Sequence, residues 1–208
     1  QDGLRQIRIG DLNNHEYHLI QFPEPVYSAW GGHNPEFDNQ MVRFHYTSLV
    51  TPESVFDYDM VTRMRILRKQ HPVLGGYDPE QYTSERVWAK AEDGTRVPIS
   101  LVYKKGARDR GRAPLLLYGY GSYGHSIDPH FSSNRLSLMD RGLIYAIAHI
   151  RGGGEMGRPW YENGKYLTKR NSFTDFIACA EHLIAKKYTS PEQLVALGGS
   201  AGGLLMGA

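Results

Sequence analysis

The sequence predicts an antiparallel β region over residues 1–76, followed by an α/β domain with a parallel sheet over residues 77–208. Short runs of alternating apolar and polar residues, separated by turn clusters, fill the first region. The second region contains continuous apolar runs, which are typical of strands buried on both faces. Segments with helical spacing separate these runs, and this order favours parallel pairing with right-handed crossovers.

The first region contains three clear alternating runs, RQIRI, EYHLI and MVRFHYTSLV. Clusters rich in Gly, Asn, Asp, Pro and Ser separate them, namely GDLNN, GGHNPEFDN and TPES. Such clusters form turns, so these runs are expected to pair as antiparallel strands. The segment VLGGYDPEQY then combines Gly75, Gly76 and Pro79, which predicts a linker between the two regions.

The second region begins with a segment, residues 85–105, that predicts a β-hairpin with Asp93 and Gly94 at its turn. The runs APLLLY and GLIYAIAHI predict the next two strands. Between them, SNRLSLMDRG has helical spacing and ends at Gly142, a residue typical of a helix C-cap. Together these segments predict one β-α-β unit.

A second helix is predicted from Ser172 to about Lys187, because Ser172 and Asp175 have capping-box spacing and an apolar face follows. This face comprises Phe173, Phe176, Ile177, Ala180, Leu183 and Ile184. The segment TSPEQL predicts a capped turn with Pro191 at a first helical position. The run LVAL then predicts another buried strand.

Composition indicates an ordinary soluble globular protein, with 40% hydrophobic residues, 22% charged residues and a net charge of +2. No clustered stripe of Lys and Arg occurs, so no nucleic-acid partner is expected. No apolar run approaches the roughly 18 residues of a membrane span, so no membrane partner is expected. The single cysteine, Cys179, is expected in the core, and its lack of an internal disulfide partner fits a reducing compartment. We therefore expect a cytoplasmic location, with the periplasm left open.

The two ends of the sequence indicate a piece of a longer protein. Gln1 is not an initiator Met, and no signal peptide follows it. The apolar run after Ser200 stops soon, without a cap or a polar finish. We therefore expect further sequence on both sides.

Ser200 is the candidate nucleophile, because residues 198–202 match the pattern G-x-S-x-G. A predicted strand leads into the pattern, and GLLMGA after it can begin a helix. This context is typical of a strained turn that lifts a serine hydroxyl above a sheet, with the N–H of Ala201 directed at a developing oxyanion. The alternative is a glycine-rich turn that carries a passive serine.

Two glycine patterns indicate a competing function, dinucleotide binding. Residues 119–124 and 152–157 both match G-x-G-x-x-G and both follow a predicted strand. Pyrophosphate binding needs a helix that starts at the glycines, and at both places a helix is expected several residues too late. No cofactor is therefore predicted. Because no set of Cys and His has ligand spacing, no metal site is predicted either.

Three longer segments carry a resemblance to a known family, namely LYGYGSYGHSIDPHFSSNRLSLMDRG, AHIRGGGEMGRPWYENGKYL and GGSAGGLLMGA. Together they resemble the prolyl oligopeptidase family, most closely its oligopeptidase B branch. Asp175, Leu204 and Leu205 match the family signature, whereas Cys179 stands where a small Ala is usual. The resemblance implies the last blades of a β-propeller over residues 1–76 and the first part of an α/β-hydrolase domain, its N-terminal half, over residues 77–208.

The resemblance also implies roles for individual residues. Ser200 corresponds to the acylated nucleophile, and Tyr120 and Ala201 correspond to the oxyanion-hole donors. Contact with the substrate is implied for Tyr123, Asp128 and His130, of which Asp128 keeps a carboxylate that faces the P2 side chain and His130 replaces a second one. The Asp and His of the catalytic triad are expected beyond residue 208.

The implied function is a serine-type oligopeptidase that hydrolyses short peptides after Arg or Lys through an acyl-enzyme. On its own, this chain is expected to be inactive, because the groups that activate Ser200 lie outside it. An acyl-peptide hydrolase or a carboxylesterase of the same fold is an alternative. A non-catalytic binding protein that contains a propeller is another, and the oligomeric state is left open.

Overall fold

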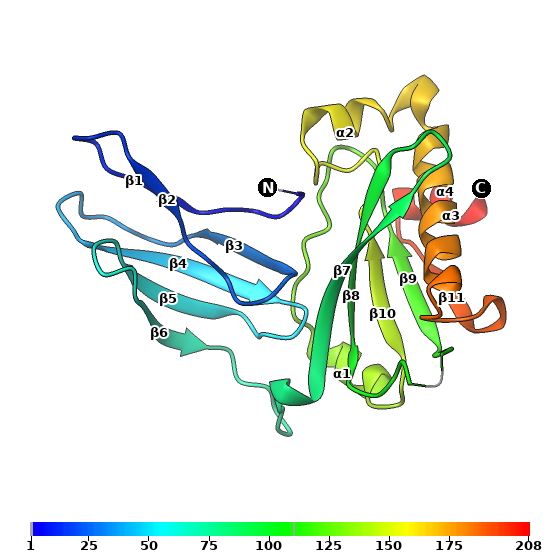
Figure 1. Ribbon diagram of the computed structural model, residues 1–208, viewed down its shortest axis with the longest axis horizontal. Coiled ribbons are helices and arrows are strands. Elements are labelled where there is room, and N and C mark those ends of the chain that lie inside the picture. Colours follow the sequence, from blue (N-terminus) through cyan, green and yellow to red (C-terminus); the bar gives the residue numbers. More distant parts are fainter. Residues whose placement is uncertain (1, 110) are drawn as a thin grey trace.

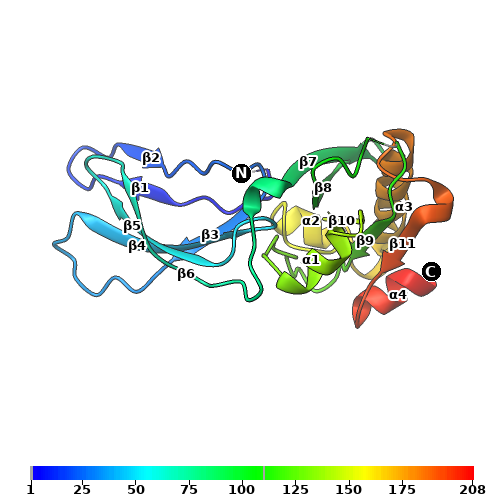
Figure 2. The same cartoon turned by 90° about the horizontal axis from the view of Figure 1, so that it is seen from below.

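The computed structural model describes residues 2–109 and 111–208 and contains two β regions that lie side by side (Figures 1 and 2). The first region holds only antiparallel strands, and the second holds a five-stranded sheet with helices on both faces. Among the described residues, no helix is both long enough and apolar enough to cross a bilayer.

The first region forms two antiparallel sheets, as the alternating runs predicted. A two-stranded sheet pairs β1 (Arg8–Gly10) with β2 (Tyr17–Leu19). A four-stranded sheet follows chain order through β3 (Tyr27–Gly31), β4 (Met41–Ser48), β5 (Ser54–Asp59) and β6 (Arg65–Gln70). A four-stranded antiparallel meander of this kind is the unit of a β-propeller blade. We call these four strands the blade.

A hairpin opens the second region. After the 3-10 turn Pro79–Gln81, strand β7 (Tyr82–Lys90) pairs antiparallel with β8 (Arg96–Lys104). Gly94 at its turn has φ +85°, a left-handed conformation that favours glycine. The predicted hairpin is therefore confirmed. The linker around residue 76 lies between β6 and β7, and its assignment as the boundary between two domains stays a prediction.

The five strands of the second sheet have the order β11-β9-β10-β8-β7. Strands β10 (Ile144–Ala148) and β11 (Leu194–Leu197) both run parallel to β9 (Leu115–Gly119), as predicted. The hairpin joins the same sheet, where β8 is antiparallel to β10. The sheet is therefore mixed, and the carboxyl ends of β9, β10 and β11 lie at one edge.

The crossovers contain several short helices and one long one. These are α1 (Ser133–Met139) between β9 and β10, then α2 (Arg158–Glu162), the 3-10 turn Tyr166–Thr168, α3 (Arg170–Ala185) and the 3-10 turn Pro191–Gln193 before β11. Helix α4 (Ala201–Gly207) follows β11. Figure 1 shows α3 along the sheet and α2 beyond the carboxyl ends of its parallel strands.

The sheet buries a different core on each face. On one face, Phe176, Cys179 and Leu183 of α3 pack against Leu115 and Leu117. On the other, Met139 of α1 shares a core with Val102 and Ile147 of the sheet and with Val26 and Leu49 of the first region. The two regions are thus joined by a common apolar core, and α1 and α3 lie on opposite sides of the sheet (Figure 2).

The structure corrects the predicted start of the long helix. Helix α3 begins at Arg170, and Ser172 lies inside it, fully buried, instead of capping it. The Ser172 hydroxyl donates to Arg151 O at 2.6 Å, and Asp175 pairs with Arg151 instead of completing a capping box. The helix ends at Ala185, before the predicted Lys187, which has φ +60°.

The structure also tests the predictions made for Ile177, for the segment after the second glycine pattern and for Cys179. Ile177, predicted on the buried face of the helix, is 55% exposed. Helix α2 begins at Arg158 directly after Gly157, so the prediction that a helix follows this second glycine pattern several residues too late was wrong. The helix comprises only 5 residues. Cys179 is fully buried in the core, as predicted, and burial raises the pKa of its thiol.

The prediction that LVAL is a buried strand was wrong for this chain: β11 lies at the edge of the sheet, and its Val195 and Leu197 side chains are 55% and 47% exposed. An exposed apolar edge is a template for pairing with another chain. The 208-residue chain prepared alone should therefore self-associate, and Val195→Lys should roughly halve the associated fraction measured by analytical ultracentrifugation. Val61→Lys, which changes an exposed turn residue, is the matched control. Equal association of both variants and the unmodified chain would show that β11 is not the contact.

Candidate active site

Ser200 lies at the sharp turn between β11 and α4, directly after the carboxyl end of β11. Its backbone has φ +54° and ψ −121°, a combination that costs a non-glycine residue roughly 1–3 kcal/mol. The side chain is exposed, as expected for a hydroxyl raised above the sheet edge. Strain of this kind at an exposed serine indicates a functional position rather than a passive turn.

The glycines around Ser200 are required by close backbone packing. A Cβ at Gly198 would overlap Gly202 O, and a Cβ at Gly202 would lie 2.8 Å from Gly119 O. At Gly119 itself, a Cβ would lie 2.6 Å from the Phe176 ring on α3. The nucleophile turn is therefore seated directly on the end of β9, with no room for side chains between them.

Tyr120 follows β9 and lies beside the same turn. Its Cδ2 atom is 3.7 Å from the position that a Cβ of Gly202 would take, and its ring packs edge-on against His125 at 5.7 Å between centroids. Ala201 is the first residue of α4, so its N–H belongs to the donors that have no acceptor within the helix. The structure thus brings Ser200, Tyr120 and Ala201 to one sheet edge, while their catalytic roles stay predictions.

The residues expected to contact substrate lie on the segment after Tyr120. Tyr123 is 76% exposed and has φ +59°. Asp128 forms an ion pair with Arg5 at 3.0 Å. His130 is exposed and meets the ring of Trp30 edge-on at 6.3 Å between centroids. Asp128 and His130 therefore contact the first region of the chain, and their contact with a substrate stays a prediction.

His149 precedes Ser200 in the chain and is a possible general base, but its contacts are with other residues. It is buried, with its Nε2 2.7 Å from Ser100 Oγ and its Nδ1 3.6 Å from Glu155 Oε1. These contacts hold its ring between β8 and the loop after β10. His149 is therefore not positioned to act as the general base for Ser200.

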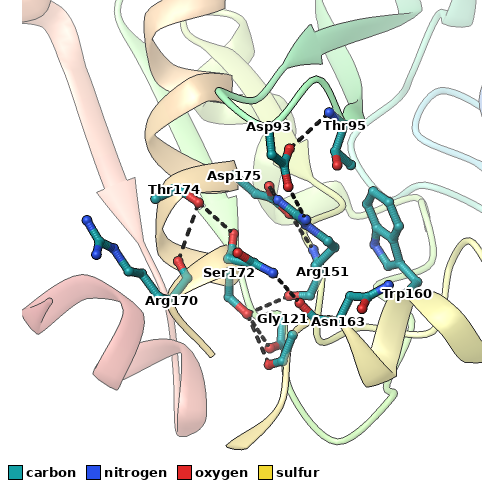
Figure 3. Close-up of polar contacts among 12 residues, drawn as sticks. Asp93, Thr95, Gly121, Arg151, Trp160, Asn163, Arg170, Ser172, Thr174 and Asp175 are labelled. Atoms are coloured by element: carbon teal, nitrogen blue, oxygen red, sulfur yellow. Dashed lines mark hydrogen bonds and ion pairs between the residues drawn. The ribbon is translucent and has the colours of Figure 1, made fainter. Parts of the chain in front are cut away.

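A buried ion pair lies next to this edge. Asp175 is fully buried, and it accepts hydrogen bonds from the backbone N–H of Arg151 at 3.0 Å and from its guanidinium at 2.9 and 2.6 Å. Figure 3 shows Arg151 between Asp175 and Asp93, whose carboxylate it reaches at 2.6 Å. Asp175 raises the pKa of Arg151, and the Thr95 N–H together with Arg151 lowers the pKa of Asp93 to about 2.

The loop that carries Arg151 also touches the loop that carries Tyr120. A Cβ at Gly152 would overlap Gly121 O, and Gly124 N donates to Gly152 O at 3.0 Å. Gly152 in turn donates to Trp160 O at 3.0 Å. The absence of a side chain at Gly152 thus lets the two loops meet backbone to backbone. No group of His, Cys, Asp and Glu in the described part of the chain is arranged to hold a metal ion.

Two family models match this chain. The model described as "Prolyl oligopeptidase, N-terminal beta-propeller domain" matches residues 1–71, and the model described as "Prolyl oligopeptidase family" matches residues 129–208. The chain belongs to the prolyl oligopeptidase family. Its fold is accordingly the end of a β-propeller followed by the start of an α/β-hydrolase catalytic domain, as the sequence predicted.

Individual members of the prolyl oligopeptidase family match all or nearly all of the chain. "Protease 2" of Moraxella lacunata is 46% identical over 208 residues, which are 100% of this chain and 30% of that protein. "Dipeptidyl aminopeptidase BI" of Pseudoxanthomonas mexicana is 49% identical over 91% of this chain and 26% of its own length. The solved structure of oligopeptidase B from Trypanosoma brucei, with covalently bound antipain, matches with a TM-score of 0.88 and 47% identity, over 100% of this chain and 30% of that chain. The chain thus spans about 30% of the length of these relatives.

Sequence reasoning missed the Arg151–Asp175 pair. Asp175 was noted for its family spacing and for capping, but no local pattern assigns it a buried arginine. A charged residue inside the apolar face of a predicted helix was the one available signal, because such a residue needs a partner when buried.

Asp175→Asn tests the energetic importance of the buried pair. The change removes the buried counter-charge of Arg151 and leaves it only the half-exposed Asp93 carboxylate, so the free energy of unfolding should fall by about 3–5 kcal/mol. Chemical denaturation of the full-length protein measures this difference. Glu181→Gln, an exposed position on the same helix, is the control and should change stability by less than about 0.5 kcal/mol. Equal stability of both variants would contradict this assignment.

Proposed function

We propose that this chain carries the nucleophile of a serine peptidase that hydrolyses short peptides after Arg or Lys. The observation that supports this proposal most is the strained, exposed Ser200, packed beside Tyr120 at the carboxyl edge of the sheet. A turn without a function would not require this strained conformation, and a binding module would not require a serine at this position.

In the proposed reaction, Ser200 Oγ attacks the peptide carbonyl and loses its proton to a general base. The carbonyl oxygen becomes an oxyanion, which accepts hydrogen bonds from the Ala201 N–H and the Tyr120 hydroxyl. Collapse of this intermediate expels the amine, which takes the proton from the base, and leaves an acyl-enzyme. Water then releases the acid and restores Ser200.

The base is proposed to come from the part of the protein that these 208 residues do not include. His149 is held by Ser100 and Glu155, so it does not supply the base. The chain covers about 30% of its relatives, which leaves room for the missing Asp and His. On this proposal, the 208-residue chain has no peptidase activity by itself.

The preference for basic residues rests on the likeness to oligopeptidase B. The matching solved structure from Trypanosoma brucei holds antipain bound covalently, which is consistent with attack by a serine at the corresponding turn. We further propose that Tyr123, Asp128 and His130 face the substrate, with the Asp128 carboxylate attracting a basic P2 side chain. Its ion pair with Arg5 competes for that role.

Ser200→Ala in the full-length protein tests the proposed function. Without the nucleophile, hydrolysis of a chromogenic peptide with Arg at P1 should fall by at least about 10⁴-fold in kcat. Ser137→Ala, an exposed position on α1, is the control. Acylated peptides and simple esters in the same assay distinguish a peptidase from an acyl-peptide hydrolase or an esterase. Turnover that survives Ser200→Ala would overturn the proposal, and so would turnover by the 208-residue chain alone that depends on Ser200.

Arg5→Gln tests the P2 assignment. Loss of the Arg5 charge frees Asp128, so the ratio of kcat/KM for Arg-Arg over Ala-Arg peptides should rise about two- to five-fold, as expected for a partly exposed ion pair. Asp128→Asn should lower the same ratio. Arg8→Gln, an exposed arginine on β1, is the matched control. A ratio that is unchanged in both Arg5→Gln and Asp128→Asn would place Asp128 away from the substrate.

A further inference from the structure

Lys169 lies directly before α3, and its ammonium is directed into the loop that follows β9. Its Nζ is 2.5 Å from Gly121 O, 2.8 Å from Ser122 Oγ and 3.2 Å from Ser172 Oγ. An ammonium has three N–H donors, so these contacts use all of them. Two of the three acceptors belong to the Tyr120 loop, which we define as residues 119–124.

The Lys169 charge has no carboxylate partner. None of the ion pairs between the residues that the structure describes includes Lys169. Burial lowers the pKa of its ammonium, with no opposing charge to raise it. A lysine that only needed a stable position would be expected on the surface or beside an acid. Here the ammonium contacts two neutral oxygens of the Tyr120 loop, the Ser172 hydroxyl and the Phe173 ring, whose centroid is 5.9 Å away.

The contacts of the Gly121 carbonyl connect Lys169 to the nucleophile turn. Gly121 directly follows Tyr120, and its carbonyl is also 3.4 Å from the buried Ser172 Oγ. The close approach of Gly152 blocks this carbonyl on another side. Tyr120 in turn packs on Gly202, two residues after Ser200. A continuous set of contacts therefore runs from Lys169 through the peptide of Gly121 to Tyr120 and the Ser200 turn.

We propose that Lys169 is a positioning residue, which holds the carbonyl of Gly121 so that the Tyr120 hydroxyl is set over Ser200 before the oxyanion forms. This inference rests on the proposed function and adds to it. Preorganised donors stabilise an oxyanion because they need no rearrangement during the reaction. Without Lys169, the Tyr120 loop retains its backbone contacts with Gly152, but the carbonyl of Gly121, the residue after Tyr120, loses its charged hydrogen bond.

A double-mutant cycle between Lys169 and Tyr120 in the full-length protein tests the proposal. Tyr120→Phe should lower kcat about 10²- to 10³-fold, as for the loss of one oxyanion donor. Lys169→Met should lower kcat by roughly 10- to 100-fold, with KM changed less than about twofold, because the lost interaction acts in the transition state. In the Tyr120→Phe background, Lys169→Met should change kcat by less than about threefold. Lys186→Met, an exposed lysine at the end of α3, is the control.

Further variants separate positioning from folding. Lys169→Arg keeps the charge and the donors, so it should recover most of the activity lost in Lys169→Met. If Lys169→Met does not fold, Lys169→Gln enters the same cycle, because its amide can still donate to one acceptor. Thermal unfolding of each variant shows whether it is folded.

Two outcomes overturn the inference and leave the proposed function intact. One is a Lys169 effect on kcat that is equally large with and without the Tyr120 hydroxyl. The other is an effect confined to KM. Turnover that persists in Ser200→Ala is a different result, because it removes the proposed function itself, whatever the cycle shows.

Discussion

The close approach of three backbone segments at the carboxyl edge of the sheet is the constraint on which the candidate site depends. A Cβ of Gly152 would overlap Gly121 O, and a Cβ of Gly202 would lie 2.8 Å from Gly119 O. Side chains at these positions would force the loops apart, so glycine is needed at each. Because the segments touch, the position of Tyr120 is fixed by the loop after β10 and by the turn at Ser200 together.

Two cations, the buried Arg151 and the half-buried Lys169, act on this edge in different ways. Arg151 is matched by Asp175, and the pair joins the end of β10 to α3, with Asp93 on the β7–β8 turn as a second partner. A buried pair of this kind contributes modestly compared with an apolar core, yet its loss is costly because it leaves an unpaired charge. Lys169 has neutral hydrogen-bond acceptors instead, two of them in the Tyr120 loop. Arg151 is therefore suited to stabilise the packing of α3 against the end of β10, and Lys169 is suited to position the Tyr120 loop.

Local signals account for what the sequence predicted correctly. The hairpin turn at Gly94 and the apolar strands follow from residue types and their periodicity, and the strained turn at Ser200 follows from its glycines. The capping box predicted at Ser172 was wrong because a tertiary contact, not a local signal, decides the role of this residue. A serine with an acid three residues later fits a capping box, but the same spacing also fits two buried residues of one helix face, and only the tertiary partner Arg151 distinguishes them. The contacts of Lys169 left no local signal either.

The core shared by the two regions also affects the position of the segment after Tyr120, which carries Asp128 and His130. Val26 and Leu49, which flank strands β3 and β4, pack with Val102 and Ile147, so the first region contacts the face of the sheet opposite α3. The segment after Tyr120 passes between these regions, and it meets the first region at Arg5 and Trp30 through Asp128 and His130. Tyr120 is thus positioned by the loops at the edge of the five-stranded sheet, whereas Asp128 also depends on where the first region lies. A shift of the first region would therefore alter the proposed P2 contact while it left the geometry of Ser200 and Tyr120 in place.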